Sequence, residues 1–301
     1  MKFSVCISSL LAGAASSFVL PQTPTTTTTV TQLSAFRQPI MAGNWKMNPE
    51  TEEEALSLAS EVAERLGAET CATGGDSVDE STCTEVVVFP PFPFISKVKD
   101  AVAGAGLVVG AQNFFYEDKG AFTGSVSASM VKSTGCEYVL CGHSERRTLF
   151  ADSDSNINLK VKKTLDSGMK PILCIGETQE EFEIGIKKEV CATQLSKDLY
   201  GITKEQMKDV VIAYEPVWAI GTGLVCGAED ANEIHAYCRE VLTNLFDEEV
   251  AQATRIQYGG SVKPDNVDDI MAMPDIDGCL VGGASLEGEG FARIVNFKRA
   301  E

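Results

Sequence analysis

The 301-residue chain has few of the residues that build metal sites. It contains two histidines, His143 and His235, and its ten cysteines include no Cys-x-x-Cys pair. Thiolate and imidazole metal sites need ligands that cluster in the sequence. The sequence therefore predicts no metal site, and it predicts most cysteines to be small buried core residues.

Long apolar runs and an excess of basic residues are also missing. No apolar stretch reaches the roughly 18 residues of a membrane span. The formal net charge of −18 argues against nucleic acid or an anionic membrane as a partner. An anionic substrate would have to be held by local donors that work against this overall charge.

Acidic residues are absent before Glu50. Lys2 precedes an apolar stretch, Ala15-Ser16-Ser17 offers a cleavage site of small residues, and threonines follow from Thr25 to Thr29. This pattern resembles the two-part presequence of plastids enclosed by extra membranes, as in diatoms and related algae. We expect residues 1–36 to be such a presequence, disordered or removed, and residues 37–301 to be the folded protein in the plastid stroma. A secretory or cytoplasmic protein is the alternative.

From residue 40 onward, short apolar runs alternate with amphipathic stretches. Strands are expected at Ile40–Trp45, Glu85–Phe89, Leu107–Ala111, Tyr138–Gly142, Pro171–Ile175, Val210–Tyr214, Arg255–Tyr258 and Gly278–Val281. Helical patterns between them include Glu53–Arg65, Ile157–Leu165 and Asp230–Phe246; in the last, Arg239 is expected to face water and His235 to be structural.

Eight strand–helix units in about 260 residues predict the α/β class and a single closed (β/α)8 barrel. An open, doubly wound sheet is the competing architecture. It would place a Gly-x-Gly-x-x-Gly turn after the first strand, and this turn is missing. In a barrel, functional residues lie where the strands end.

The sixth strand ends at Glu215, and the loop after it is unusually apolar. The loop runs Pro216, Val217, Trp218, Ala219, Ile220, Gly221, Thr222, Gly223. Bulky apolar residues in a loop need cover, so we expect this loop to close as a lid over the carboxylate. A carboxylate under an apolar lid is typical of a general base that works without water. The alternative is a buried carboxylate in an ion pair beside a packed loop.

Other strand ends supply further chemical groups. Asn44 and Lys46 follow the first strand, and His143 and Glu145 follow the fourth. Glycine turns follow the last two strands and include the candidate phosphate-binding residues Ser261, Gly282 and Gly283, with Gly221 from the lid. Backbone N–H groups at such turns and helix N-termini favour phosphate.

These motifs together resemble the triosephosphate isomerase family. They are Asn44-Trp45-Lys46, the segment from His143 to Arg147, Ala213–Gly223, Tyr258–Ser261 and Gly282–Gly283, and the resemblance runs from about residue 40 to the C-terminus. It implies a TIM barrel that interconverts dihydroxyacetone phosphate and D-glyceraldehyde 3-phosphate through an enediolate, with no cofactor.

The resemblance also implies a role for each residue, since this family is itself an established example of pKa tuning and lid closure. Glu215 shuttles the proton and His143 is a neutral electrophile, kept neutral by the helix N-terminus that follows. Lys46 offsets the enediolate charge, Asn44 donates a hydrogen bond, and Glu145 pairs with Lys46 until substrate arrives.

A homodimer is implied as well. The segment from Gln112 to Gly124 resembles the family's third loop, in which Thr123 reaches into a neighbouring subunit and Arg146 supports the loop. Ser125 stands where the family usually has Glu, so one interface hydrogen bond is in doubt.

Alternatives remain open at this stage. A barrel synthase or lyase would need a wider pocket and more acids and bases, and an inactive scaffold paralogue should have lost Lys46, His143 or Glu215.

Cys71 and Cys83 lie in an insertion between Gly67 and Thr84, where they could be free thiols or a reversible disulfide. Cys226, at the second end of the lid, is either an accessible hinge thiol or an inert buried one.

Overall fold

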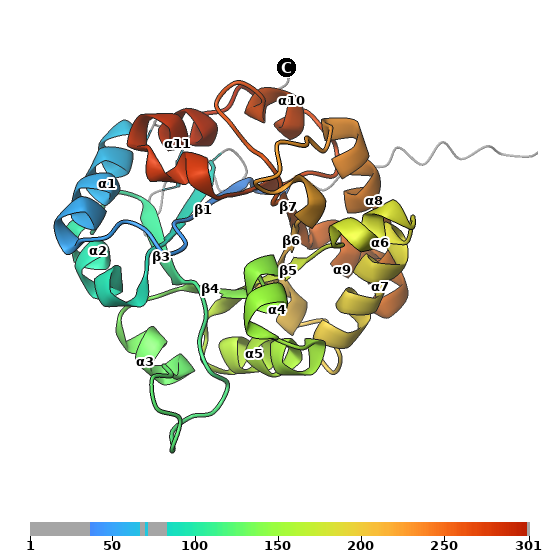
Figure 1. The fold of residues 1–301 in the computed structure, drawn as a ribbon, viewed down its shortest axis with the longest axis horizontal. Coiled ribbons are helices and arrows are strands. Elements are labelled where there is room, and N and C mark those ends of the chain that lie inside the picture. The colour runs from blue at the N-terminus through green and yellow to red at the C-terminus, as the bar shows by residue number, and fades with distance from the viewer. Residues whose placement is uncertain (1–36, 67–69, 72–82, 300–301) are drawn as a thin grey trace, which may run out of the picture. The chain divides into compact units, whose positions relative to one another are not determined.

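The eight predicted strands form a closed parallel barrel in the computed structural model, which describes residues 37–66, 70–71 and 83–299 (Figure 1). Each strand pairs with the next, and β8 pairs with β1. The strands are β1 Ile40–Asn44, β2 Glu85–Phe89, β3 Leu107–Ala111, β4 Tyr138–Cys141, β5 Lys170–Ile175, β6 Val211–Tyr214, β7 Arg255–Tyr258 and β8 Gly278–Val281. The predicted barrel is confirmed, with strand ends shifted by at most one residue. The predicted presequence lies outside the described residues.

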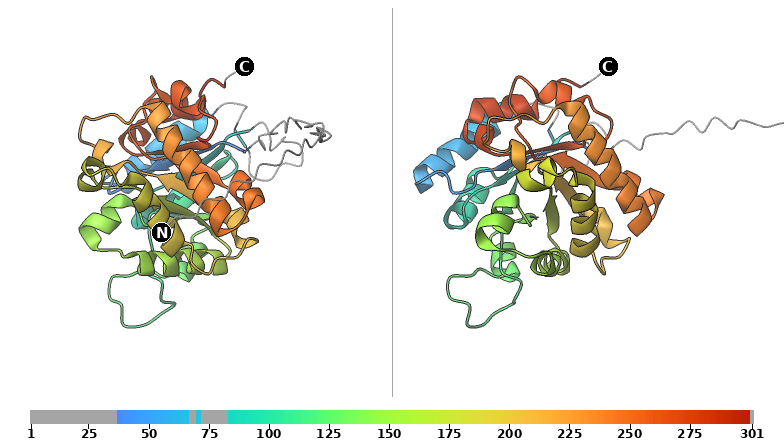
Figure 2. Two further views of the ribbon diagram at one scale, coloured as in Figure 1. Left: turned by 90° about the vertical axis from the view of Figure 1, so that its right-hand side faces the viewer. Right: turned by 45° about the vertical axis from the view of Figure 1, so that its right-hand side comes forward.

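Helices surround the barrel on all sides (Figures 1 and 2). They are α1 Glu52–Arg65, α2 Ile95–Ala101, α3 Ala128–Ser133, α4 Ser144–Phe150, α5 Asp154–Asp166, α6 Gln179–Glu183, α7 Lys187–Asp198, α8 Ala228–Leu245, α9 Glu248–Ala253, α10 Val267–Met271 and α11 Gly288–Val295. Short 3₁₀ turns η1 Phe92–Phe94, η2 Gln206–Asp209, η3 Val217–Ala219 and η4 Gly283–Leu286 complete the order. No helix in the described part of the chain is both long and apolar enough to cross a membrane.

Two apolar cores hold the barrel together. The inner core fills the barrel with side chains such as Phe89, Tyr138 and Ile172. The larger outer core lies between the strands and the helices. It includes Trp45, which directly follows β1 and is fully buried. Because successive residues of a strand face opposite sides, a continuous apolar run supplies side chains to both the inner and the outer core.

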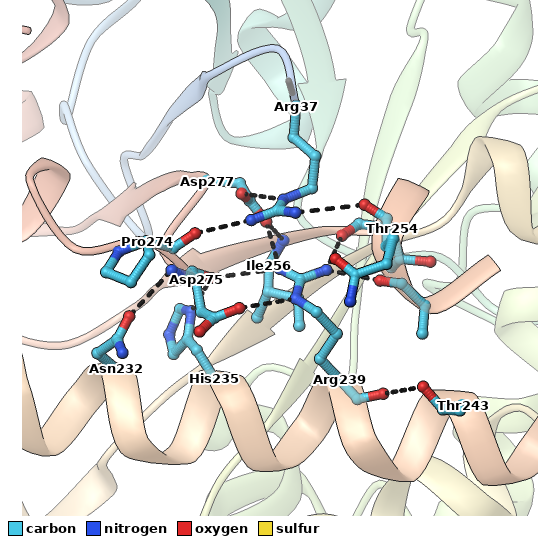
Figure 3. Close-up of polar contacts among 12 residues, drawn as sticks. Arg37, Asn232, His235, Arg239, Thr243, Thr254, Ile256, Pro274, Asp275 and Asp277 are labelled. Atoms are coloured by element: carbon cyan, nitrogen blue, oxygen red, sulfur yellow. Dashed lines mark hydrogen bonds and ion pairs between the residues drawn. The ribbon is translucent and has the colours of Figure 1, made fainter. Parts of the chain in front are cut away.

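The predicted exposure of Arg239 on α8 is wrong. The side chain of Arg239 is buried and its guanidinium pairs with Asp275 at 3.0 Å and with Asp277 at 3.0 Å (Figure 3). Arg37, just before β1, forms a hydrogen-bonded ion pair with the same Asp277. A buried carboxylate needs such partners, and the cluster joins the start of β1 to α8 and to the segment before β8.

His235 lies beside this cluster as a buried structural residue, as expected. Its Nδ1 is 3.2 Å from the Asp275 carbonyl oxygen, and its ring meets Tyr214 edge-on. Burial lowers the pKa of His235 to about 3. The imidazole is therefore neutral at physiological pH, and its Nδ1–H donates to that carbonyl.

A disulfide joins Cys71 and Cys83, with the two Cα atoms 5.1 Å apart. The bond lies at the start of β2, on the end of the barrel opposite the carboxyl ends of the strands. Of the alternatives left open by the sequence, the structure contains the bonded pair. The free cysteines among the described residues are all buried, as predicted for core thiols.

Candidate active site

Glu215 follows β6 directly, and its carboxylate is buried at the carboxyl ends of the strands. The Ser144 N–H donates to Oε2 at 2.9 Å and the Ser144 hydroxyl donates to Oε1 at 3.2 Å. His143 Nε2 lies 3.0 Å from Oε1. The end of β6 and the start of α4 thus meet around one carboxylate.

These contacts shift the pKa of Glu215 in a definite direction. Burial alone raises the pKa of a carboxyl group. Here the His143 ring and the two Ser144 donors outweigh burial and lower the pKa of Glu215 below its ordinary value. The carboxylate is therefore ionised at neutral pH, as a proton acceptor must be.

His143 precedes α4, and its ring is held on both sides. Nδ1 accepts the backbone N–H of Glu145 at 3.3 Å, so Nε2 carries the proton that faces Glu215. Burial lowers the pKa of His143, but the Glu215 carboxylate more than offsets this and the net pKa is raised. The helix N-terminus favours a neutral ring, as predicted from the sequence, whereas the Glu215 carboxylate acts in the opposite direction.

Lys46 lies at the end of β1 in a left-handed backbone conformation, with φ of 54°. Such a conformation is costly for a residue with a side chain and is found at functional sites. It is held because Asn44 Oδ1 accepts the Lys46 N–H and Gln112 donates to the Lys46 carbonyl. The Lys46 ammonium pairs with Glu145 at 2.7 Å, as predicted.

A cavity of about 360 Å³ opens at this end of the barrel and brings the predicted groups together. Its lining includes Asn44, Lys46, His143, Glu215, Ile220, Gly221, Gly259, Gly260, Ser261, Val262, Lys263, Leu280, Gly282, Gly283 and Ala284. Lys46, His143 and Glu215 therefore share one cavity with the two glycine turns. The volume suits a small ligand, at the low end of the usual range for ligand pockets.

The loop after Glu215 is anchored at its start and exposed at its tip. Trp218 and Ala219 are buried in η3, and the Trp218 indole donates to Glu177 Oε1 at 2.6 Å. The segment from Gly221 to Val225 is exposed. Cys226 is buried, and burial raises its thiol pKa to about 12, so here the structure agrees with the inert thiol.

The two residues predicted at a dimer interface, Thr123 and Arg146, lie on the loop between β3 and α3 and on α4. Thr123 is exposed on the long loop between β3 and α3, which projects from the body of the barrel (Figure 1). Arg146 on α4 pairs with Asp152 and lies over the Phe150 ring.

Sequence reasoning missed several residues of the site. Ser144 holds Glu215, Glu177 holds the start of the lid, and Lys263 lines the cavity beside Ser261. Only Lys263 carried a signal, because it follows a glycine turn at a strand end. Nothing in the sequence reports that Glu177 meets Trp218. Within the described residues, no three His, Cys, Asp or Glu side chains are grouped to hold a metal ion.

Comparison with known proteins gives one consistent result. The triosephosphate isomerase family matches residues 39–298. The triosephosphate isomerase of Alkaliphilus metalliredigens is 46% identical over 261 residues, which cover 87% of this chain and 100% of that protein. Those of Carboxydothermus hydrogenoformans and Prosthecochloris aestuarii are each 48% identical over 259 residues, which cover 86% of this chain and 98% and 97% of those proteins. The chain belongs to the triosephosphate isomerase family, and it is an isomerase.

Proposed function

We propose that this chain interconverts dihydroxyacetone phosphate and D-glyceraldehyde 3-phosphate by proton transfer through an enediolate. One observation carries the proposal: an ionised, buried Glu215 shares a cavity with Lys46, His143 and two glycine turns. Family membership supports the same reaction. The reaction serves glycolysis and gluconeogenesis.

Glu215 is the base in this proposal. It takes a proton from one carbon of the triose phosphate and returns it to the neighbouring carbon. Its hydrogen bonds with Ser144 stabilise the charged form. When the carboxylate turns toward the substrate these bonds break, and the carboxylate becomes more basic.

His143 and Lys46 stabilise the charge that develops on the substrate oxygens. The protonated Nε2 of His143 faces the cavity and can donate to either oxygen once Glu215 has moved away. The Glu145 N–H on Nδ1 then keeps the ring in this tautomer. Lys46 exchanges Glu145 for the enediolate, and Asn44 donates a further hydrogen bond.

The phosphate is held by backbone N–H groups of Gly221, Ser261, Gly282 and Gly283, all of which line the cavity. Backbone donors suit this task because N–H groups at glycine turns and helix N-termini point at the anion, and the helix dipole favours negative charge. Closure of the lid residues Pro216 to Gly223 brings Gly221 to the phosphate and keeps water away from the intermediate.

The direct test is an assay of purified protein with D-glyceraldehyde 3-phosphate, coupled to reduction of dihydroxyacetone phosphate. We expect turnover that is unchanged by a metal chelator. The matched variant is Glu215→Gln, which keeps the shape of the cavity and removes the proposed base, so its turnover should be strongly reduced. A chain with no turnover in either direction would contradict the proposal.

A homodimer is the second part of the proposal. A smaller cavity of about 210 Å³ lies beside the active site and is lined by Met47, Gln112, Arg146 and Phe150. Met47 is 91% exposed and Phe150 is 61% exposed. Apolar side chains gathered in this way mark an interface. In the proposed dimer, the third loop of a second copy, which contains the exposed Thr123, would occupy this cavity. Sedimentation velocity of the purified protein tests the dimer.

The third part concerns location. The acid-free, hydroxyl-rich segment of residues 1–36 supports import into a plastid and a role in the Calvin cycle. A fusion of these residues to a fluorescent protein, expressed in a diatom, should give plastid fluorescence. Secretion or cytoplasmic fluorescence would contradict this part and leave the enzymatic proposal intact.

A further inference from the structure

An aromatic stack joins the lid to the loop after β5. The ring of Phe182, on α6, lies parallel to the indole of Trp218 in η3, with centroids 4.1 Å apart and planes 18° apart. Phe182 is 39% exposed, whereas Trp218 is 9% exposed. Phe182 therefore covers one face of the indole that would otherwise meet water.

The indole ring of Trp218 is held by hydrogen bonding at its edge as well as by stacking on its face. Its indole N–H donates to Glu177 Oε1 at 2.6 Å, and the Val217 N–H donates to the Glu177 carbonyl at 3.1 Å. Thr222, at the lid tip, donates its hydroxyl to the Trp218 carbonyl at 2.7 Å. Trp218 thus connects the fixed end of the lid to its exposed tip.

The two contacts on the indole differ in how they respond to motion. A hydrogen bond from an N–H weakens steeply when its angle changes. Two stacked rings can turn in their own planes and slide while they keep most of their contact. A small displacement of the indole that lengthens its bond to Glu177 therefore leaves the stack with Phe182 largely intact.

We propose that Phe182 is a positioning residue for the isomerase reaction, which keeps Trp218 in place while the lid moves. It touches neither substrate nor reacting atoms. The inference rests on the proposed function, because it concerns the lid that shields the enediolate.

Loss of the stack should appear as leakage from the intermediate. If the lid stands open, the enediolate can break its C3–O bond. The phosphate then leaves with the electron pair, and the remaining enol rearranges to methylglyoxal. Inorganic phosphate released per isomerisation, after the release without enzyme is subtracted, therefore measures how well the lid is held, and this corrected ratio does not depend on how much of the enzyme is folded.

The test compares Phe182→Leu, which keeps an apolar side chain, with Phe182→Tyr, which keeps the ring. We expect Phe182→Leu to raise the phosphate ratio and KM about 2- to 10-fold, the range for loss of one aromatic pair, with a smaller change in kcat. Phe182→Tyr should remain within about 2-fold of the parent. Emission of Trp218 should shift to the red in Phe182→Leu, while fully buried Trp45 gives a constant background.

The control is Ile184→Ala, two residues further along and 65% exposed. It should leave the ratio, KM and emission unchanged. The inference is overturned if Phe182→Leu matches the parent in ratio and KM, or if Ile184→Ala raises the ratio equally. A parent chain with no isomerisation would instead refute the proposed function, so the two failures are distinguishable.

Discussion

The Glu215 carboxylate is held by Ser144 and His143, and in the proposed reaction it must move away from them to reach the substrate. Two donors from Ser144 and one from His143 stabilise its charged form and lower its pKa. A carboxylate that is so well stabilised is a poor base. In the proposed reaction, departure of the carboxylate from Ser144 toward the substrate would therefore both position the base and strengthen it.

The first prediction concerns this base. Glu215→Gln keeps the size of the side chain and removes its ability to accept a proton. We expect kcat to fall by at least about 100-fold, the low end of general-base effects. The affinity for a phosphate-bearing analogue, measured by calorimetry, should change far less. Turnover within about threefold of the parent would remove Glu215 from the mechanism.

The second prediction concerns the pKa of Glu215. Ser144→Ala removes the hydroxyl donor and keeps the backbone one, so the charged carboxylate loses one stabilising bond. We expect the pKa of Glu215 to rise toward its ordinary value. Carbon NMR of protein with labelled glutamate carboxyl groups follows the titration, and the signal is assigned by its loss in Glu215→Gln. A pKa that stays the same or falls would show that Ser144 does not tune the base.

At the residue scale, the sequence predicts which side chains converge better than it predicts their charge. Chemical groups at the strand ends of a barrel must converge, and the structure brings Lys46, His143 and Glu215 to one cavity; their catalytic roles stay predictions. The raised pKa of His143 and the buried Arg239 were not found. Both depend on partners far away in the sequence, Glu215 and Asp277, whose contacts no local pattern reports.

At the scale of elements, continuous apolar runs placed the strands correctly, because every barrel strand is buried on both faces. The three helical stretches named from periodicity correspond to α1, α5 and α8, with ends that differ by at most three residues. On α8, Arg239 takes a buried position and satisfies Asp275 and Asp277 instead of facing water (Figure 3).

The third prediction concerns His235 on α8. Its folded pKa of about 3 lies well below the ordinary value of 6.5, so below pH 6.5 the unfolded chain binds a proton that the folded chain does not. Folded stability is therefore lost as the pH falls from 6.5 to about 3, by up to about 1.4 kcal/mol per pH unit. In His235→Gln this component is absent, and urea unfolding between pH 7 and pH 4 should show a weaker pH dependence. An equal dependence in both proteins would show that His235 is not responsible.

At the scale of the whole molecule, the two ends of the barrel have separate tasks. The cavity and the lid lie at the carboxyl ends of the strands, as in barrel enzymes generally. The Cys71–Cys83 disulfide and the Arg37–Asp277 contact lie at the opposite end, near the starts of β1, β2 and β8. Changes at that end should affect stability with little effect on catalysis.

The fourth prediction follows from this separation. Replacing Cys71 and Cys83 together with Ser removes the disulfide, whose short loop gives about 2–3 kcal/mol of stability. We expect a lower Tm and an isomerase rate within about twofold of the parent. A reducing agent should lower the Tm of the parent and leave that of the variant unchanged. Equal Tm values would contradict a stabilising bond, and a large loss of activity would contradict the separation of the two ends.

The most direct test of the central claim is the isomerisation of D-glyceraldehyde 3-phosphate in D₂O. Proton transfer through Glu215 predicts that part of the dihydroxyacetone phosphate carries deuterium at C1, because the carboxyl proton exchanges with solvent before it is returned. Under the same conditions Glu215→Gln should form product at least about 100-fold more slowly. Product that carries no solvent deuterium at all, formed equally fast by both proteins, would show a hydride shift and contradict the account.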